Sequence, residues 1–391
     1  MTRRPPLRVI VRRIHLWLGL SIGALFAFAG LTGSILVFYP EIDTALSPAL
    51  RAIPDGARPV SWQAVVDTLH REHPARTGAW RIEVTTDGGA IPVRYYRPKE
   101  TAGRDFAPLL GWIDPVRLTT IRTGFWGDTI VTWIYDLHYR LLLEKPGGIV
   151  MGIAGIVMLL MIASGIWAWW PRPGGWWRAL RFKRDAAPIR RLYDWHKLIG
   201  LTGAILLLVV TATGVMLDLP DQTRSLIARA SPLYRMPPLA VVAHGKPLTV
   251  DRLVMVAERR FPGAALAWIE TPASPTGTTR INLAQDGEPS RRFPRTNVWL
   301  DPYTGAILAT RDGLAETRGD VVMNWLHPLH GGEAFGLTGR ILAVIAGIVP
   351  IALFVTGVLR WQRRRHREGR LAPGTNPAST TPERPVRPVA R

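Results

Sequence analysis

The chain has 391 residues, a formal net charge of +20, 16 tryptophans and no cysteine. The lack of thiols excludes disulfides, thiolate metal sites and covalent C-x-x-C-H haem attachment. In a soluble protein this charge would suggest nucleic acid, but four apolar blocks of about 20 residues indicate a membrane protein instead. We therefore expect no nucleic-acid partner.

The apolar blocks cover residues 14–39, 149–170, 198–217 and 341–361, and none carries a charge before its last turn. Each is long enough to cross a bilayer as a helix. The first block is too long for a removable signal peptide and has no small-residue cleavage site. The blocks predict four transmembrane helices.

Basic residues predict how these helices are oriented. Residues 1–13, 171–197 and 360–391 hold 22 basic and only four acidic residues, whereas the two long segments between them are almost neutral. Basic segments stay on the cytoplasmic side of a membrane. We expect both termini and the middle loop in the cytoplasm and the long segments outside, in contact with membrane lipid at their ends.

The predicted elements follow in chain order. They are a cytoplasmic N-terminus (1–13), a transmembrane helix (14–39), an outside domain (40–130), an interfacial segment plus a second transmembrane helix (131–170), a basic cytoplasmic loop (171–195), a third transmembrane helix (196–217), a second outside domain (218–322), an interfacial segment plus a fourth transmembrane helix (323–361) and a cytoplasmic tail (362–391). The tail is rich in Pro, Ser and Thr and is expected to be disordered.

Both outside segments show one pattern. An amphipathic helix is predicted at "VSWQAVVDTLHREHP" and at "LTVDRLVMVAERRF". β-rich stretches follow and end in "WIDPVRLTTI" and "WLDPYTGAIL", where Asp-Pro marks a turn. Each segment is expected to form an α+β domain with a small sheet and one covering helix.

The chain also repeats internally. "HLWLGLSIGALFAFAGLTG" from His15 aligns with "HKLIGLTGAILLLVVTATG" from His196 at an offset of 181 residues. Farther on, His138 aligns with His330 and Gly165 with Gly357, both at an offset of 192. Two copies in the same direction predict a pseudo-twofold axis along the membrane normal.

Four of the nine histidines occupy repeated positions. In the predicted topology His15 and His196 meet at the inner face, and His138 and His330 meet at the outer face. A b-type haem needs two such axial nitrogens and an apolar slot. The repeat therefore predicts two non-covalent haems b, one for each pair. His327 has no repeated partner and is kept as an alternative outer ligand.

Cations and glycines near each pair fit this hypothesis. Arginines that would hold the haem propionates are Arg12, Arg13, Arg190 and Arg191 at the inner pair, and Arg140 and Arg340 at the outer pair. Glycines that would let a flat macrocycle approach the backbone are Gly19, Gly200, Gly331 and Gly332. No side chain is predicted to act as a catalytic acid, base or nucleophile.

Two motifs resemble a known family. "VWLDPYTGAIL" looks like the PepSY signature, and "RLYDWHKLIGLTGAILLLVVTATGVM" and "LHPLHGGEAFGLTGRILAVIAGIVP" resemble the PepSY-associated transmembrane-helix family. That family includes iron-regulated inner-membrane proteins and ferric-siderophore reductases of the ferrioxamine-reductase type. In the first copy, "DPVRLTTI" departs from the usual D-P-x-T-G turn.

The resemblance implies a fold and a function. The fold would be a membrane α-helical bundle of four transmembrane helices in two parallel repeats, with two extracytoplasmic α+β PepSY-like domains. The protein would lie in the bacterial inner membrane and reduce ferric siderophore in the periplasm, and His15, His196, His138 and His330 would be its haem ligands. No G-x-G-x-x-G loop supports nicotinamide or flavin binding, so a quinol or a cytoplasmic reductase would supply electrons.

Two alternatives remain open from the sequence. One is a haem-free PepSY-type binding or regulatory membrane protein. The other is a transporter that carries iron or siderophore across the membrane. A haem absorption spectrum separates the first from a reductase, and uptake into liposomes separates the second.

Overall fold

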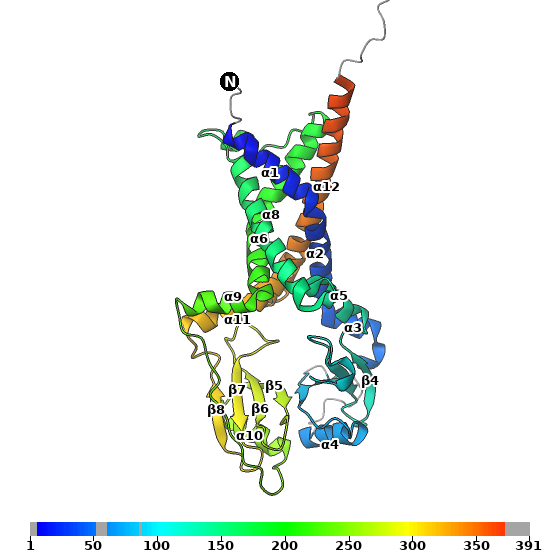
Figure 1. The fold of residues 1–391 in the computed structure, drawn as a ribbon, viewed down its shortest axis with the longest axis vertical. Coiled ribbons are helices and arrows are strands. Elements are labelled where there is room, and N and C mark those ends of the chain that lie inside the picture. Colours follow the sequence, from blue (N-terminus) through cyan, green and yellow to red (C-terminus); the bar gives the residue numbers. More distant parts are fainter. Residues whose placement is uncertain (1–5, 52–60, 86–87, 372–391) are drawn as a thin grey trace, which may run out of the picture.

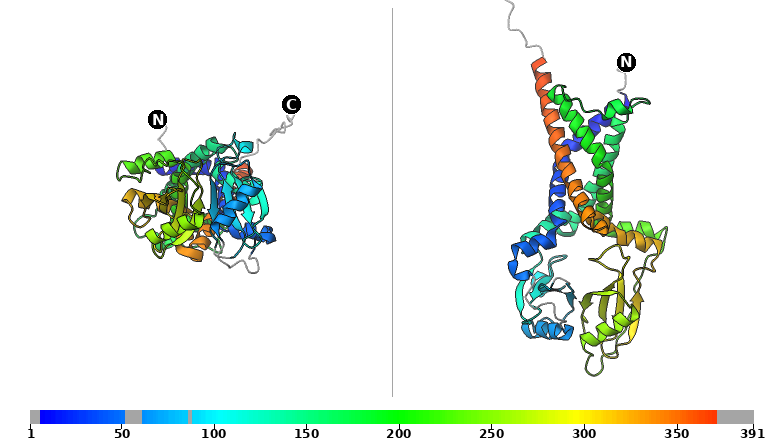
Figure 2. Two further views of the ribbon diagram at one scale, coloured as in Figure 1. Left: turned by 90° about the horizontal axis from the view of Figure 1, so that it is seen from below. Right: turned by 180° about the vertical axis from the view of Figure 1, so that it is seen from behind.

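The computed structural model describes residues 6–51, 61–85 and 88–371. A bundle of helices is joined at one end to an antiparallel β-sheet (Figure 1). Both described ends of the chain lie at the other end of the bundle, away from the sheet. The view from behind shows the same two layers (Figure 2).

Three helices are each long and apolar enough to cross a membrane. They are α6 (Glu144–Trp169), α8 (Pro188–Asp218) and α12 (Gly336–Leu371). The first predicted span is instead a pair, α1 (Leu7–Ser21) and α2 (Gly23–Leu36), bent by 55°. The bend falls between Ser21 and Gly23, and sharp kinks are common where Gly and Ser adjoin.

The helices extend beyond the apolar blocks that predicted them. α8 begins at Pro188, inside the predicted cytoplasmic loop, and proline is favoured at a first helical position. α12 continues to Leu371, so residues 362–371 of the predicted disordered tail are helical. Arginine favours helix and stabilises a helix C-terminus. Residues 372–391 of that tail lie outside the described residues.

Small residues let α2 and α12 pack closely. A Cβ atom added to Gly30 would lie 2.2 Å from the carbonyl oxygen of Gly347. The Ser34 hydroxyl donates to the carbonyl of Val344, one turn away on α12, at 3.1 Å. Close backbone approach at small residues is the usual way that membrane helices associate.

Four shorter helices lie across the base of the bundle, between it and the sheet (Figure 1). They are α3 (Tyr39–Leu46), α5 (Ile130–Arg140), α9 (Pro220–Ala228) and α11 (Arg318–Gly331). α5 and α11 correspond to the interfacial segments expected before the second and fourth spans. Left-handed backbone at Leu141, Leu142 and Glu144 turns the chain from α5 into α6.

The sheet has eight strands in the order β4-β3-β2-β1-β5-β6-β7-β8, and every neighbouring pair is antiparallel. The strands are β1 (Trp80–Glu83), β2 (Ile91–Tyr95), β3 (Leu109–Ile113), β4 (Thr120–Phe125), β5 (Ala265–Glu270), β6 (Thr279–Ala284), β7 (Thr296–Leu300) and β8 (Ile307–Arg311). The chain also forms the short helix α7 (Trp176–Leu180) and the 3-10 turns η1 (Pro48–Leu50), η2 (Lys99–Thr101) and η3 (Glu333–Phe335).

The two predicted outside domains share this one sheet. β1 from the first segment pairs with β5 from the second, and Ile82 lies opposite Ile269. The prediction of two separate small sheets is therefore wrong. Joining them removes two open strand edges, which would otherwise invite pairing with other chains.

One hydrophobic core serves both halves of the sheet. α4 (Trp62–Glu72) and α10 (Val250–Arg260) contribute buried side chains to the same cluster as the strands. Its fully buried members are Val65, Ile82, Ile113, Ala257, Ile269, Ile281, Leu283, Val298 and Leu300. The helix expected in each outside segment is thus present, but the two helices share a core.

The two Asp-Pro turns have the same backbone despite their different sequences. Asp114 Oδ1 accepts from the N–H groups of Val116 and Arg117, both at 2.8 Å. Asp301 Oδ1 accepts from those of Tyr303 and Thr304, at 2.8 and 3.2 Å. Leu118 of the first turn has a left-handed backbone with φ +51°, and the corresponding residue of the second turn, Gly305, has φ +75°. The departure from the D-P-x-T-G pattern therefore leaves the turn intact.

The shared core predicts how the sheet unfolds. Ile82→Ala should lower the free energy of unfolding by about 2–5 kcal/mol, because a cavity forms where the two halves meet. Both halves should then melt earlier, in one transition measured by circular dichroism. Val116→Ala is the control, since Val116 is 52% exposed. Two separate melting transitions, of which Ile82→Ala shifts only one, would contradict a single core.

The second Asp-Pro turn predicts a pH dependence. Burial alone would raise the pKa of Asp301, but hydrogen bonds from the N–H groups of Tyr303 and Thr304 outweigh it and hold that pKa below 3.8. The ionised form therefore stabilises the fold above pH 3.8, and this stabilisation is lost as pH falls through the lowered pKa. Denaturant unfolding of wild type and Asp301→Asn should differ at neutral pH and converge in acid. A constant difference at every pH would rule this out.

Candidate functional site

The structure brings the four repeated histidines together as two pairs. The ring centroids of His15 on α1 and His196 on α8 are 6.3 Å apart. Those of His138 on α5 and His330 on α11 are 6.2 Å apart. His330 contacts the carbonyl of Val210, 14 residues beyond His196 on α8, a rise of about 21 Å. The inner pair therefore lies toward the chain termini and the outer pair toward the sheet.

Each of the four rings is held by a hydroxyl from a neighbouring helix. Nδ1 of His15 lies 3.0 Å from the Ser164 hydroxyl, and Nδ1 of His138 lies 3.1 Å from that of Thr32. In the other half, Nδ1 of His196 lies 3.0 Å from Thr356 Oγ1 and 3.1 Å from a carbonyl of α12. Nδ1 of His330 lies 3.3 Å from Thr213 Oγ1 and 2.9 Å from the Val210 carbonyl.

These contacts determine which ring nitrogen carries the proton. Each hydroxyl already donates its only proton to a carbonyl of its own helix, at distances from 2.7 to 3.0 Å. The hydroxyl must therefore accept from Nδ1–H. In a neutral imidazole the proton on Nδ1 leaves Nε2 with a free lone pair. Nε2 of each of the four histidines is thus left free to bind a metal ion. Proteins commonly orient metal-ligating histidines in this way, through a hydrogen bond made by the other ring nitrogen.

A glycine follows each of these hydroxyl residues and makes room for the ring. A Cβ added to Gly33 would lie 2.8 Å from Cε1 of His138, and one on Gly214 would lie 2.9 Å from Cε1 of His330. The corresponding distances are 3.0 Å for Gly165 at His15 and 3.7 Å for Gly357 at His196. A Ser/Thr-Gly pair on one helix therefore receives a histidine from another. The Ser/Thr-Gly pair occurs at all four positions in the sequence. The repeat depends on the four glycines, Thr32 and Thr213, and it does not include Ser164 or Thr356.

The spacing of each pair fits one metal ion between two imidazoles. With metal–nitrogen bonds of about 2 Å and ring centroids about 1.1 Å beyond each Nε2, the centroids should be about 6 Å apart. Both observed separations, 6.3 and 6.2 Å, agree with this. The four side chains therefore suit bis-imidazole ligation of a haem iron.

The inner pair opens into a cavity of about 700 Å³, within the range of about 300–1,000 Å³ that is common for cofactor sites. Its wall is mainly apolar and includes the predicted Gly19 and Gly200. Arginines that line it are Arg12, Arg190, Arg360 and Arg364. The first two were predicted. Arg360 was missed, although it lies one turn beyond Gly357 on the same helix.

The other predicted cations lie elsewhere. Arg13 is exposed, and Arg191 lines a separate surface pocket beside Trp195. At the outer pair, Arg340 pairs with Glu41 at 2.7 Å and Arg140 pairs with Glu144 at 3.5 Å. These two guanidinium groups are therefore already engaged by carboxylates.

The glycines beside the outer pair shape the chain. Gly332 has φ +77°, and a Cβ there would lie 2.3 Å from the carbonyl oxygen of Gly339. It therefore allows a tight turn between α11 and α12. A Cβ on Gly331 would meet nothing within 4 Å. Gly332 therefore serves the turn, and the role of Gly331 in making room for a macrocycle stays a prediction.

His327 lies apart from the outer pair. Its ring packs against Phe293 at a centroid distance of 4.6 Å, and its Nδ1 lies 3.9 Å from a carboxylate oxygen of Glu333. Nδ1 is buried without a hydrogen-bond partner among the described residues. The structure thus places His330 opposite His138 and directs His327 toward the sheet.

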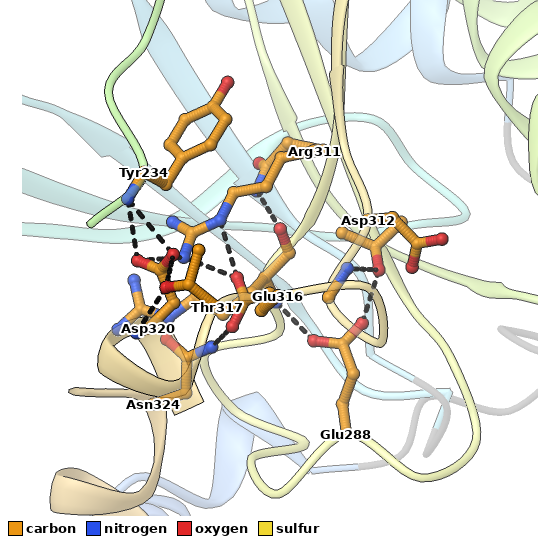
Figure 3. A network of polar contacts seen from close by, with 12 residues as sticks. Tyr234, Glu288, Arg311, Asp312, Glu316, Thr317, Asp320 and Asn324 are labelled. Atoms are coloured by element: carbon orange, nitrogen blue, oxygen red, sulfur yellow. Dashed lines mark hydrogen bonds and ion pairs between the residues drawn. The ribbon is translucent and has the colours of Figure 1, made fainter. Parts of the chain in front are cut away.

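A buried polar network fixes α11 to the sheet (Figure 3). At the end of β8, Arg311 Nε donates to Glu316 at 2.7 Å, and Asn324 of α11 donates to the same carboxylate. Asp320 accepts from the backbone N–H of Tyr234 at 3.0 Å and caps the helix through Thr317. The side chains of Glu316 and Asp320 are buried, so α11 and its His330 are held firmly against the strands.

An analogous contact fixes α5. Arg104 donates to the carbonyl of Trp126 at 2.9 Å and pairs with Asp136 of α5 and Glu144 of α6, both at 3.2 Å. The Trp126 indole N–H donates to the same Asp136 at 2.8 Å. Desolvation raises the pKa of Asp136, against the effects of Trp126 and Arg104. Each outer histidine is therefore mounted on a helix that an arginine ties to its half of the sheet.

Comparison with known proteins shows the family to which this chain belongs. The sequence profile of the family described as "PepSY-associated TM region" matches residues 12–364. A curated relative is the uncharacterized protein PA4219 of Pseudomonas aeruginosa, which is 27% identical over 258 residues. The match covers 59% of this chain and 63% of that protein, so the chain spans less than two thirds of the relative's length.

The glycine contacts predict a difference between the two pairs. Gly33→Ala and Gly214→Ala should displace His138 and His330, because a Cβ would come within 3.0 Å of each ring. Gly357→Ala is the matched control, since its Cβ would meet His196 at an ordinary 3.7 Å. Alanine favours helix over glycine, so the backbone should tolerate all three changes.

The measurement is the haem content of the purified protein and its low-spin electron paramagnetic resonance signal. Gly33→Ala and Gly214→Ala should each lose the outer signal by more than half, and Gly357→Ala should keep both signals. Equal spectra for all three variants would show that these glycines do not position the rings.

Proposed function

We propose that this chain, which belongs to the PepSY-associated transmembrane family, is a di-haem electron-transfer protein of the bacterial inner membrane that reduces ferric siderophore in the periplasm. The observation that carries the proposal is the set of four Nδ1 atoms, each 3.0–3.3 Å from a hydroxyl oxygen on another helix. This arrangement leaves four Nε2 lone pairs, two at each end of one bundle.

The residues have separate parts in this function. His15 and His196 would hold the inner haem b, and His138 and His330 the outer one. When bound by two imidazoles, haem supplies one-electron redox chemistry. Ser164, Thr32, Thr356 and Thr213 fix the ring tautomers, and the apolar bundle keeps water away from both pairs. Arg12, Arg190, Arg360 and Arg364 place positive charge around the inner cavity, where propionate carboxylates would be stabilised.

The direction of electron flow follows from the topology. Both described ends of the chain lie at the end of the bundle away from the sheet (Figure 1). The inner pair is the one nearer to these ends, because the outer pair is carried by α5 and α11 on the sheet side. Basic ends stay in the cytoplasm, so the sheet would be periplasmic. One electron delivered at the outer pair converts a ferric chelate to a ferrous one. Siderophores hold ferrous iron far more weakly, so reduction releases the metal. A quinol or a cytoplasmic reductase would be the donor.

The proposal predicts two haems per chain and a division of labour between the pairs. A pyridine haemochrome assay should give two haems b per wild-type polypeptide. His15→Ala and His196→Ala should each lose one low-spin centre. After reduction with dithionite, these variants should still be reoxidised by a ferric trihydroxamate. His138→Ala and His330→Ala should lose the other centre and react with the chelate at least about tenfold more slowly.

His327→Ala is the matched control for His330→Ala, because both residues lie on α11 and only His330 faces His138. It should keep both low-spin signals. A wild-type protein without a Soret band would exclude a haem reductase and favour a binding or regulatory role. Accumulation of intact siderophore inside liposomes would favour a transporter.

A further inference from the structure

The β6–β7 loop (residues 285–295) connects the sheet with the outer histidine pair. Within it the Ser290 hydroxyl donates to Glu333, just beyond α11, and accepts from the N–H of Phe293 at 3.0 Å. The Phe293 ring packs on both His327 and Trp268, at centroid distances of 4.6 and 5.9 Å. The loop is therefore held in place on both sides, by the strands below and by α11 above.

This loop places Arg292 against the first half of the chain. Its guanidinium carbon lies 3.9 Å from the ring centroid of Tyr39, which follows α2, and 5.3 Å from that of Phe293. α2 carries Thr32 and Gly33, the residues that hold His138. On the other side stand Glu333 and Arg340, whose charges both act on Arg292. Arg292 thus lies on the sheet side of the outer pair, between the two halves of the chain.

Arg292 has no anionic partner within the described part of the chain. Its side chain is partly buried, and its recorded contacts are with two aromatic rings. Burial lowers the pKa of Arg292 to about 10; Glu333 opposes this and Arg340 adds to it. A partly buried charge that meets its nearest carboxylate only at a distance keeps part of its desolvation cost. An anion that reached Arg292 would therefore be bound strongly.

The neighbouring cations are unsuited to that role. Arg340 pairs with Glu41 at 2.7 Å and donates to the carbonyl of Val37 at 2.8 Å. Arg140 pairs with Glu144. Of these three arginines, Arg292 is the one that makes no ion pair and no side-chain hydrogen bond among the described residues, and its planar fork matches a carboxylate in bidentate geometry.

We propose that Arg292 is the anion-binding residue of the outer site and that its ligand is a carboxylate. The inference rests on the proposed function, because that function supplies two sources of carboxylate: a propionate of the outer haem and a carboxylate-bearing ferric chelate. Sequence reasoning assigned no role to Arg292, since it lies far from the membrane helices along the chain and has no repeated partner.

The test compares Arg292→Gln, Arg292→Lys and Arg291→Gln with the wild type. Arg291 is the matched control because it is the exposed neighbour on the same loop. The first measurement is the rate of haem transfer from each full-length protein to apomyoglobin. The second is the Kd for ferric citrate and for an uncharged ferric trihydroxamate, by equilibrium dialysis. Thermal unfolding of each variant verifies that the sheet is intact.

A propionate ligand predicts that Arg292→Gln loses one of its two haems about tenfold faster or more, with partial recovery in Arg292→Lys. A chelate carboxylate predicts unchanged haem loss, a Kd for ferric citrate raised about tenfold, and an unchanged Kd for the trihydroxamate. Either result supports the proposal.

The proposal is overturned if a folded Arg292→Gln variant matches both wild type and Arg291→Gln in haem loss and in citrate binding. Arg292 would then serve only to pin the loop on Tyr39. If the wild type holds no haem, the proposed function fails, and the citrate Kd alone decides the role of Arg292. The two failures are therefore distinguishable.

Discussion

The contact between a histidine on one helix and a Ser/Thr-Gly pair on another determines the arrangement of the bundle. The hydroxyl gives its proton to its own helix and must accept from Nδ1–H, while the glycine leaves space for the ring. A buried imidazole without that hydrogen bond would be costly in an apolar bundle. Because the contact occurs four times, it connects α1 with α6, α5 with α2, α8 with α12 and α11 with α8. The ring positions and the helix positions therefore depend on each other.

The sheet gives the outer pair a rigidity that short interfacial helices lack. α5 and α11 lie at the base of the bundle, and such helices are marginally stable by themselves. Arg104 ties α5 to the first half of the sheet, and Arg311 ties α11 to the second. Pairing of β1 with β5 makes the halves one body with one core. The helices that carry His138 and His330 are thus both held by a sheet that lies outside the bundle.

The two sites differ in their surroundings, although their histidines correspond. The inner pair opens into a cavity with several arginines at its wall. At the other end of the bundle, the β6–β7 loop places Phe293 against His327 of α11 and Arg292 against Tyr39. The proposed electron relay, with a donor on one side and a bulky chelate on the other, would use such a difference. The inner end has a cavity within the bundle, whereas the helix that carries His330 contacts the β6–β7 loop of the sheet.

The sequence by itself determined the apolar helices and the pairing of the four histidines, because hydrophobic length and repeat spacing are read directly along the chain. It also indicated the family, which the profile match over residues 12–364 confirms. Only the tertiary structure showed that the two outside segments share one sheet, because β1–β5 pairing joins strands nearly 190 residues apart. Likewise, only the fold could show that Arg140 and Arg340 are engaged by Glu144 and Glu41 while Arg292 packs against Tyr39. Whether an arginine is available to a ligand depends on which carboxylates the fold brings beside it. The spacing of residues along the chain does not show this.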